Sequence, residues 1–166
     1  MPGIGVTLGA IVMLCALSPS IARAQKPADS STVDARQFVG TWQLASFQGD
    51  SLSVLARRGA HPTGYLFYDS TGHMAVQIKP DRARPSWPPT RVPTPAEAFE
   101  AVNGYVAYFG TYRVDTRART VTHHREGALN LDETDYVRRY EFDGPDRLVL
   151  TPVSRPGIRL VWVRVK

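Results

Sequence analysis

Apolar and polar residues alternate along most of the chain after residue 37. The clearest case is residues 73–79, where Met74, Val76 and Ile78 alternate with polar or small neighbours. Alternation with a period of two predicts strands that bury one face. On this basis we expect about eight strands, over residues 38–48, 65–69, 73–79, 108–115, 119–126, 135–143, 147–152 and 158–165.

Short turns join several of these strands in the order of the sequence. Asp69-Ser70-Thr71-Gly72 has the composition of a hairpin turn, and residues 116–118 and 144–146 are similar candidates. Consecutive strands joined in this way indicate a β-sandwich or an up-and-down barrel. The expected inward faces are rich in tyrosine, whose apolar ring and polar tip suit a cavity wall. Because an eight-stranded barrel has room for one small ligand, we favour a barrel.

One stretch interrupts the alternation. Residues 80–95 hold six prolines and the aromatic residue Trp87, so they cannot form a ladder strand. We expect a solvated loop here, or a lid at the mouth of the barrel. Thr94-Pro95-Ala96-Glu97 then has the pattern of a helix start, and we expect one short helix that ends near Val102.

The first residues have the features of an export signal. Residues 4–17 are uncharged and mostly apolar, and Ala22-Arg23-Ala24 resembles a signal-peptidase site. The apolar run is shorter than the roughly 20 residues of a spanning helix. We expect a signal peptide over 1–24, a polar linker over 25–36, and a domain over 37–166. The mature protein is then secreted or periplasmic, with no stable membrane insertion; an uncleaved N-terminal anchor is the alternative.

The distribution of charge argues against a nucleic-acid partner. The chain carries a formal net charge of +5, but its arginines are scattered rather than gathered on one predicted face. Nucleic-acid binders concentrate their basic residues, so we do not expect such a partner.

Several segments together are similar to a known family. Gly40-Thr41-Trp42 resembles the Gly-x-Trp signature of lipocalins, in which the tryptophan plugs the closed end of the barrel. An arginine of the last strand packs across that tryptophan, and Arg164 has the position for this role. The wider pattern resembles bacterial and fungal lipocalin-like proteins over residues 37–165, and includes Phe38–Leu44, Gly64–Met74, Gly104–Tyr112, Val121–His124 and Arg138–Tyr140. This resemblance implies an all-β, eight-stranded antiparallel up-and-down barrel. Gly40, Trp42 and Arg164 would be its structural signature.

Aromatic and apolar side chains are the candidates for a cavity lining. We expect a lining made by Tyr65, Phe67, Met74, Val76, Tyr108, Tyr112 and Trp162. The alternative is that these side chains fill the barrel and leave no cavity.

Three polar residues are candidates for contact with a ligand. His123 and His124 face opposite sides of a strand, and we expect His123 to point inward because it shares a side with Val121. It could be structural, contact a ligand, act as an acid or base, or bind a metal. Arg138 and Tyr140 share a side of a later strand, where Arg138 could bind an acidic group or pair with Glu126 or Glu141.

The favoured function is the binding of a small hydrophobic or amphipathic molecule inside the barrel. A cofactor-independent isomerase or cyclase is a second hypothesis, with His123 facing Tyr140, Tyr68 or Asp69 across the cavity. A cavity-free structural or partner-binding domain is a third. We find no sequence motif of a standard hydrolase, kinase or dehydrogenase, and we expect neither a metal nor a cofactor.

Overall fold

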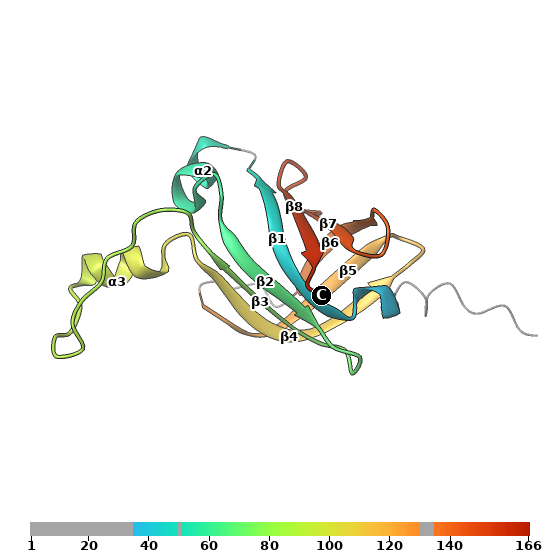
Figure 1. The fold of residues 1–166 in the computed structure, drawn as a ribbon, viewed down its shortest axis with the longest axis horizontal. Coiled ribbons are helices and arrows are strands. Elements are labelled where there is room, and N and C mark those ends of the chain that lie inside the picture. The colour runs from blue at the N-terminus through green and yellow to red at the C-terminus, as the bar shows by residue number, and fades with distance from the viewer. Residues whose placement is uncertain (1–34, 50, 130–134) are drawn as a thin grey trace, which may run out of the picture.

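The computed structural model describes residues 35–49, 51–129 and 135–166, and its strands form one closed barrel (Figure 1). Every strand pairs in antiparallel fashion with its neighbours in the sequence, and β1 pairs with β8 to close the barrel. The strands are β1 (Gly40–Gln48), β2 (Thr63–Tyr68), β3 (His73–Lys79), β4 (Val106–Asp115), β5 (Thr120–Ala128), β6 (Asp135–Phe142), β7 (Arg147–Pro152) and β8 (Arg159–Arg164). The predicted all-β, eight-stranded antiparallel barrel is confirmed.

Among the residues that the structure describes, two helices longer than a single turn lie outside the barrel wall. The predicted helix is α3 (Pro95–Val102), and it begins with a capping box in which Thr94 and Glu97 bond each other's backbone N–H groups. A second helix, α2 (Leu52–Arg58), was not predicted; Ser51 caps it and Val54 is its buried residue. Figure 1 shows α3 and the preceding loop extending away from the barrel, so the stretch we considered as a lid does not cover the mouth.

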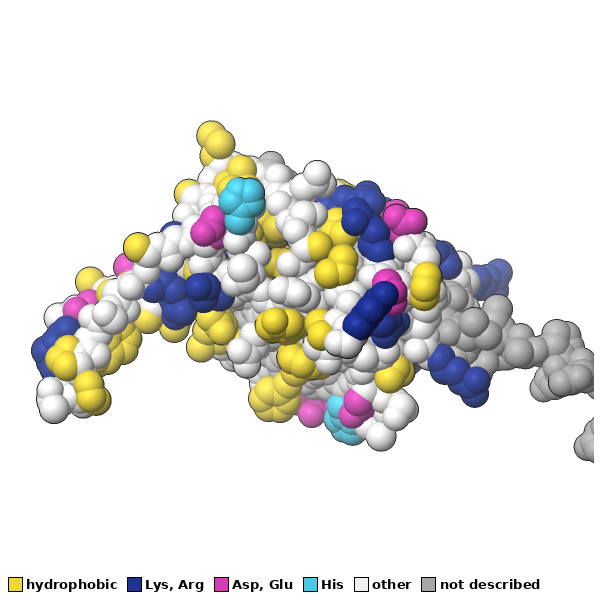
Figure 2. All heavy atoms as spheres, viewed as in Figure 1, with side chains coloured by type: hydrophobic (Ala, Val, Ile, Leu, Met, Phe, Trp, Pro, Cys, Tyr) yellow, Lys and Arg dark blue, Asp and Glu magenta, His cyan; other side chains and the backbone are white. Residues whose placement is uncertain are grey.

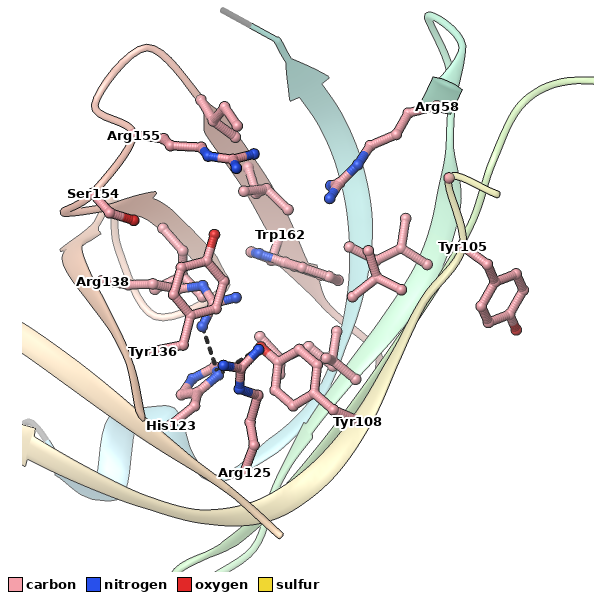
Figure 3. Close-up of a pocket in the computed structure, with 18 of the residues that line it drawn as sticks. Arg58, Tyr105, Tyr108, His123, Arg125, Tyr136, Arg138, Ser154, Arg155 and Trp162 are labelled. Carbon is pink, nitrogen blue, oxygen red and sulfur yellow. Dashed lines mark hydrogen bonds between the residues drawn. The ribbon is translucent and has the colours of Figure 1, made fainter. Parts of the chain in front are cut away.

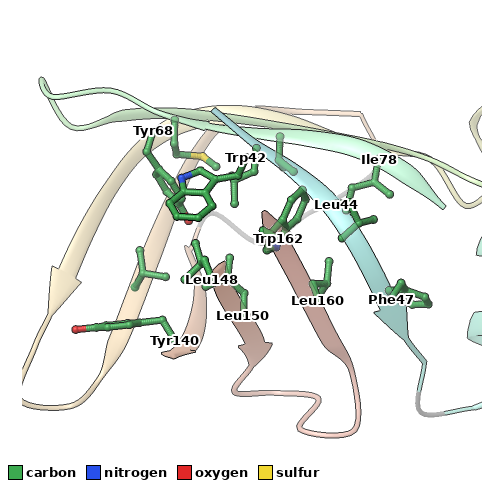
Figure 4. Packing of buried hydrophobic residues seen from close by; sticks show 14 of the residues in the cluster. Trp42, Leu44, Phe47, Tyr68, Ile78, Tyr140, Leu148, Leu150, Leu160 and Trp162 are labelled. Atoms are coloured by element: carbon green, nitrogen blue, oxygen red, sulfur yellow. The ribbon is translucent and has the colours of Figure 1, made fainter. Parts of the chain in front are cut away.

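Aromatic residues plug one end of the barrel. Trp42 and Phe38 are fully buried there, and Phe38 makes edge-to-face contacts with Tyr68, Tyr140 and Phe142. The cluster continues along the barrel through aliphatic residues of β7 and β8, such as Leu148, Leu150 and Leu160 (Figure 4). This end therefore has a packed core.

Arg164 seals the plugged end. Its guanidinium lies 4.1 Å from the centre of the Trp42 ring and donates hydrogen bonds to the backbone oxygens of Val39 and Gln37. Gly40 is tightly constrained here, because its φ is +136° and an added Cβ would lie 2.6 Å from Arg164 Nη1. The structure thus gives the signature residues Gly40, Trp42 and Arg164 a mutual packing role.

A bulge changes the facing of β1. The pairing register between β1 and β8 shifts between Leu44 and Ser46. Trp42 and Leu44 are buried on the inner face, whereas beyond the shift Ser46 is exposed and Phe47 is buried. An extra residue in one strand reverses the alternation beyond it, which a strict period of two cannot anticipate.

The exterior carries charges of both signs together with exposed apolar side chains. Figure 2 shows basic side chains scattered over the visible face of the molecule, with acidic ones among them. In the part of the chain that the structure describes, no helix has the length and apolar character needed to cross a membrane. The predicted signal peptide and most of the linker lie outside the described residues.

Candidate functional site

A cavity of about 250 Å³ occupies the end of the barrel opposite the aromatic plug. It reaches the surface beside α2 and the β7–β8 connection, since the exposed residues Arg57, Ser154 and Arg155 line its mouth. The described part of the barrel is therefore not completely filled.

One side of the cavity is apolar. Leu66 on β2 and Val76 on β3 lie opposite each other in the strand pairing, as do Leu150 on β7 and Leu160 on β8. All four line the cavity and are buried. Side chains alternate between the two faces of a strand, and these four residues lie at the positions that face the interior of the barrel.

The other side of the cavity is polar and aromatic (Figure 3). It is formed by Tyr108 on β4, His123 and Arg125 on β5, and Tyr136 and Arg138 on β6. His123 and Arg125 are two residues apart, as are Tyr136 and Arg138, so each pair shares the inner face of its strand. The guanidinium carbon of Arg138 lies 3.9 Å from the centre of the Tyr136 ring, in a cation–π contact.

His123 lies at the centre of a buried hydrogen-bond network. Its side chain is 1% exposed, with Nδ1 2.8 Å from Arg138 Nη1 and 2.9 Å from the Tyr108 hydroxyl. A guanidinium only donates, so Nδ1 must accept and carries no proton. The proton of the neutral ring is then on Nε2, which donates to the Tyr68 hydroxyl at 2.5 Å.

Burial keeps the members of this network neutral. It lowers the pKa of His123 well below its ordinary value, and the nearby Arg138 and Arg125 charges lower it further. Burial also raises the pKa of the Tyr68 hydroxyl well above its usual range, and that of Tyr108 in the same direction. At neutral pH the network therefore holds its charge on the guanidinium groups alone.

The charge of the cavity lining has one sign. Five arginines and no aspartate or glutamate occur among the described residues that line it: Arg57, Arg58, Arg125, Arg138 and Arg155. Burial lowers the pKa of Arg58, and repulsion from Arg57, Arg138 and Arg155 acts in the same direction, partly offset by Tyr136. These side chains are thus close enough to interact electrostatically.

The structure brings five of the ten predicted binding residues to the cavity. Val76, Tyr108, His123, Arg138 and Trp162 line it. Their role in binding stays a prediction. Arg138 contacts His123 and Tyr136, whereas the alternative partner Glu141 pairs with Arg159 at 3.6 Å on the exterior.

The prediction for Tyr65 and Phe67 is wrong. These side chains are 44% and 43% exposed on the outer face of β2, and the inner face carries Leu66 and Tyr68. All four residues are large and apolar or amphipathic, so these four positions do not show which face is outside. The polar Thr63, which shares the outer face with Tyr65 and Phe67, lies outside the strand that we predicted.

Met74, Tyr112 and Tyr140 belong to the plugged end rather than to the cavity lining. Met74 and Tyr140 are buried in the core, and Tyr112 packs at its edge and donates a hydrogen bond to the Asp69 backbone oxygen. Of the three partners considered for an acid–base pair with His123, the structure places Tyr68 in direct contact with it. Asp69 lies in the exposed β2–β3 turn.

Sequence reasoning missed four of the cavity arginines. The inward direction of Arg125 could have been predicted, since Arg125 lies two residues after His123 on the same face of the strand. Arg57 and Arg58 end a helix that we did not predict. Arg155 lies in a loop, which has no regular alternation from which the direction of a side chain could be predicted.

No group of three or more histidine, cysteine, aspartate or glutamate side chains converges anywhere in residues 35–49, 51–129 and 135–166.

A comparison with known protein families agrees with this geometry. A family model described as a lipocalin-like domain matches residues 39–159. No curated protein matches the sequence. Among solved structures, a redesigned beta barrel matches with a TM-score of 0.42 and 12% identity, over 80% of this chain and 95% of that one. Since the family model covers most of the chain, and the barrel is closed and plugged by Trp42 under Arg164, the chain belongs to the lipocalin-like domain family.

Proposed function

We propose that this protein binds one small amphipathic molecule inside its barrel. The observation that carries the proposal is a cavity whose two sides differ in chemistry. Leu66, Val76, Leu150 and Leu160 offer an apolar surface, while the His123 and Arg138 network faces them. Binding sites for small molecules commonly combine an apolar lining with a few fixed polar groups.

The cavity volume limits the size of the ligand. At about 250 Å³, the cavity is slightly smaller than the range typical of ligand pockets. An apolar cavity of about 150 Å³ admits benzene, so the present cavity suits a molecule with on the order of ten non-hydrogen atoms. We therefore expect a compact ligand rather than a long-chain lipid enclosed along its whole length.

The network geometry favours binding over proton transfer. A general base works best with a pKa near the operating pH and a lone pair directed at its substrate. The pKa of His123 is lowered, and its Nδ1 lone pair already accepts from Arg138 and Tyr108. The isomerase or cyclase hypothesis would need this network to rearrange, so binding is the better-supported function.

We propose that binding takes place outside the cytoplasm. This rests on the export features of residues 1–24, namely the uncharged apolar run and the Ala22-Arg23-Ala24 site.

Native mass spectrometry of the purified protein, followed by denaturation and identification of released molecules, tests the binding function. We expect a small molecule at near-stoichiometric amount, or uptake of one from an added mixture of eight-carbon amphiphiles. Val76→Phe should lower the occupancy at least tenfold, because the larger ring enters the cavity. The matched control is Gln77→Phe, which places the same ring on the exposed outer face of β3.

A protein that stays bare, and does not take up an environment-sensitive apolar dye, would contradict the proposal. Equal occupancy in the Val76→Phe and Gln77→Phe variants would also contradict it, because the ligand would then lie outside the barrel.

A further inference from the structure

We propose that the ligand is an organic acid, whose anionic group sits between Arg138 and the indole N–H of Trp162. This inference rests on the proposed binding function and specifies the chemistry of the ligand. Three features of the described residues carry it: the environment of Arg138, the state of the Trp162 nitrogen, and the charge at the mouth of the cavity.

Arg138 is a buried charge without an acidic partner. It is 7% exposed, and no ion pair joins it to a carboxylate of the described residues. It contacts the neutral His123 ring and the faces of Tyr136 and Tyr108, none of which carries a negative charge. Removing a guanidinium from water costs several kcal/mol unless a counter-charge compensates. A bound anion would supply that counter-charge, and Arg138 has further N–H groups to donate to it.

Trp162 offers a neutral donor in the same cavity. The residue is 1% exposed, yet its Nε1 has no hydrogen-bond partner among the described residues. In Figure 3, the nitrogen edge of the ring is turned toward the side of the cavity where Arg138 lies. Buried polar groups nearly always have a partner, so an unsatisfied one in a ligand cavity indicates a place for an acceptor.

The mouth of the cavity favours the entry of an anion. Arg57, Arg58 and Arg155 line it, and none of them pairs with a carboxylate of the described residues. Burial is the main cause that lowers the pKa of Arg58, and the repulsion from Arg57, Arg138 and Arg155 that adds to it is relieved when a negative charge binds nearby. A lining of one sign also raises the local concentration of oppositely charged molecules. The same positive charges would repel a cationic ligand.

Isothermal titration with octanoate, 1-octanol and octylamine tests the inference, since these probes share a chain length and differ in head group. Octanoate has ten non-hydrogen atoms, the size that the cavity suits. We expect octanoate to bind about 10- to 100-fold more tightly than 1-octanol, as a charge-assisted hydrogen bond contributes about 1.5–3 kcal/mol. Octylamine should bind least.

Three variants locate the preference in the cavity. Arg138→Met keeps most of the side-chain volume, and should reduce the ratio of octanoate to octanol affinity to near one. Arg58→Gln, at the partly exposed mouth, should reduce that ratio severalfold without endangering the fold. Arg113→Gln is the control, because it removes the same charge from the outer face of β4 and should leave the ratio unchanged.

The outcomes separate this inference from the binding function. Similar affinities for octanoate and 1-octanol, unaffected by Arg138→Met and Arg58→Gln, would overturn the acid preference and leave the binding function in place. Failure of all three probes to bind would overturn both. An equal loss of preference in Arg113→Gln would show that net charge, rather than the cavity arginines, selects the acid.

Discussion

His123 shows how one residue depends on the charges around it. Its ring accepts from a guanidinium, a contact that exists only while the imidazole is neutral. Arg138 therefore fixes the tautomer of His123, and His123 in turn fixes the direction of one Arg138 N–H group. Tyr68 and Tyr108 complete the arrangement from two other strands. The polar side of the cavity is thus held in one geometry before any ligand arrives.

This network predicts a loss of stability in mild acid. The pKa of His123 is lowered well below 6.5 in the folded protein, so the unfolded chain binds its proton first as the pH falls. Stability should therefore decrease from about pH 7 downward, by at most about 1.4 kcal/mol per pH unit. Denaturant titrations between pH 7.5 and 5.5 measure this slope. His123→Gln should flatten it, whereas His61→Gln, at an exposed position, should not. An unchanged slope in His123→Gln would refute the explanation.

Strand by strand, the sequence was informative where polar residues marked the outer face. The strands β3 and β7 were predicted with their observed bounds, and the inward direction of His123 followed from its neighbour Val121. The outward facing of Tyr65 and Phe67 was not predicted, because residues 65–68 are all apolar or aromatic and the polar Thr63 lay outside the predicted strand. A bulge in β1 reversed the facing of Ser46. The mouth arginines are on a short helix and a loop, so their meeting depends on barrel closure rather than on any local pattern.

The helix α3 should respond to substitution independently of the barrel. It has no buried residue, and its capping box depends on Thr94 and Glu97. Hydrogen bonds from Arg91 and Thr94 lower the pKa of Glu97 to about 2, so the cap remains ionised over the usual pH range. Thr94→Ala should destabilise the helix by about 1 kcal/mol.

Hydrogen exchange read by mass spectrometry checks this expectation. Amides of residues 96–102 should exchange about fivefold faster in Thr94→Ala, since about 1 kcal/mol corresponds to that factor. The midpoint of thermal unfolding should not move, and Thr90→Ala in the preceding loop serves as control. A drop of several degrees in the midpoint would show that α3 is coupled to the barrel.

At the scale of the whole molecule, the two ends of the barrel have different roles. The end around Trp42 is packed with aromatic rings and closed by Arg164, whereas the opposite end holds the cavity and its arginines. The aromatic plug lies at one end and the polar network at the other, and the apolar core extends between them. Tyr68 joins the two ends, because it packs against Phe38 and hydrogen-bonds to His123. Substitutions far from Tyr68 should contribute nearly additively between the two ends.

Arg164→Lys tests the contribution of the plugged end. Lysine cannot bond Val39 and Gln37 with a planar fork or cover the Trp42 ring equally well, so we expect a loss of about 2 kcal/mol. Arg147→Lys, in an exposed pair with Asp143, should cost less than about 1 kcal/mol. Urea unfolding monitored by tryptophan fluorescence compares the two. Similar losses in both variants would contradict a special role for Arg164.

The pairing of β1 with β8 also determines the order in which the protein can fold. During synthesis β1 leaves the ribosome well before β8. The edge of β1 that pairs with β8 therefore has no partner until residues 159–164 emerge. Until then the growing sheet exposes two edges, each able to pair with another chain. Contacts between segments so distant in sequence also form slowly. The closure that makes the finished barrel free of edges therefore leaves its nascent form dependent on protection from aggregation.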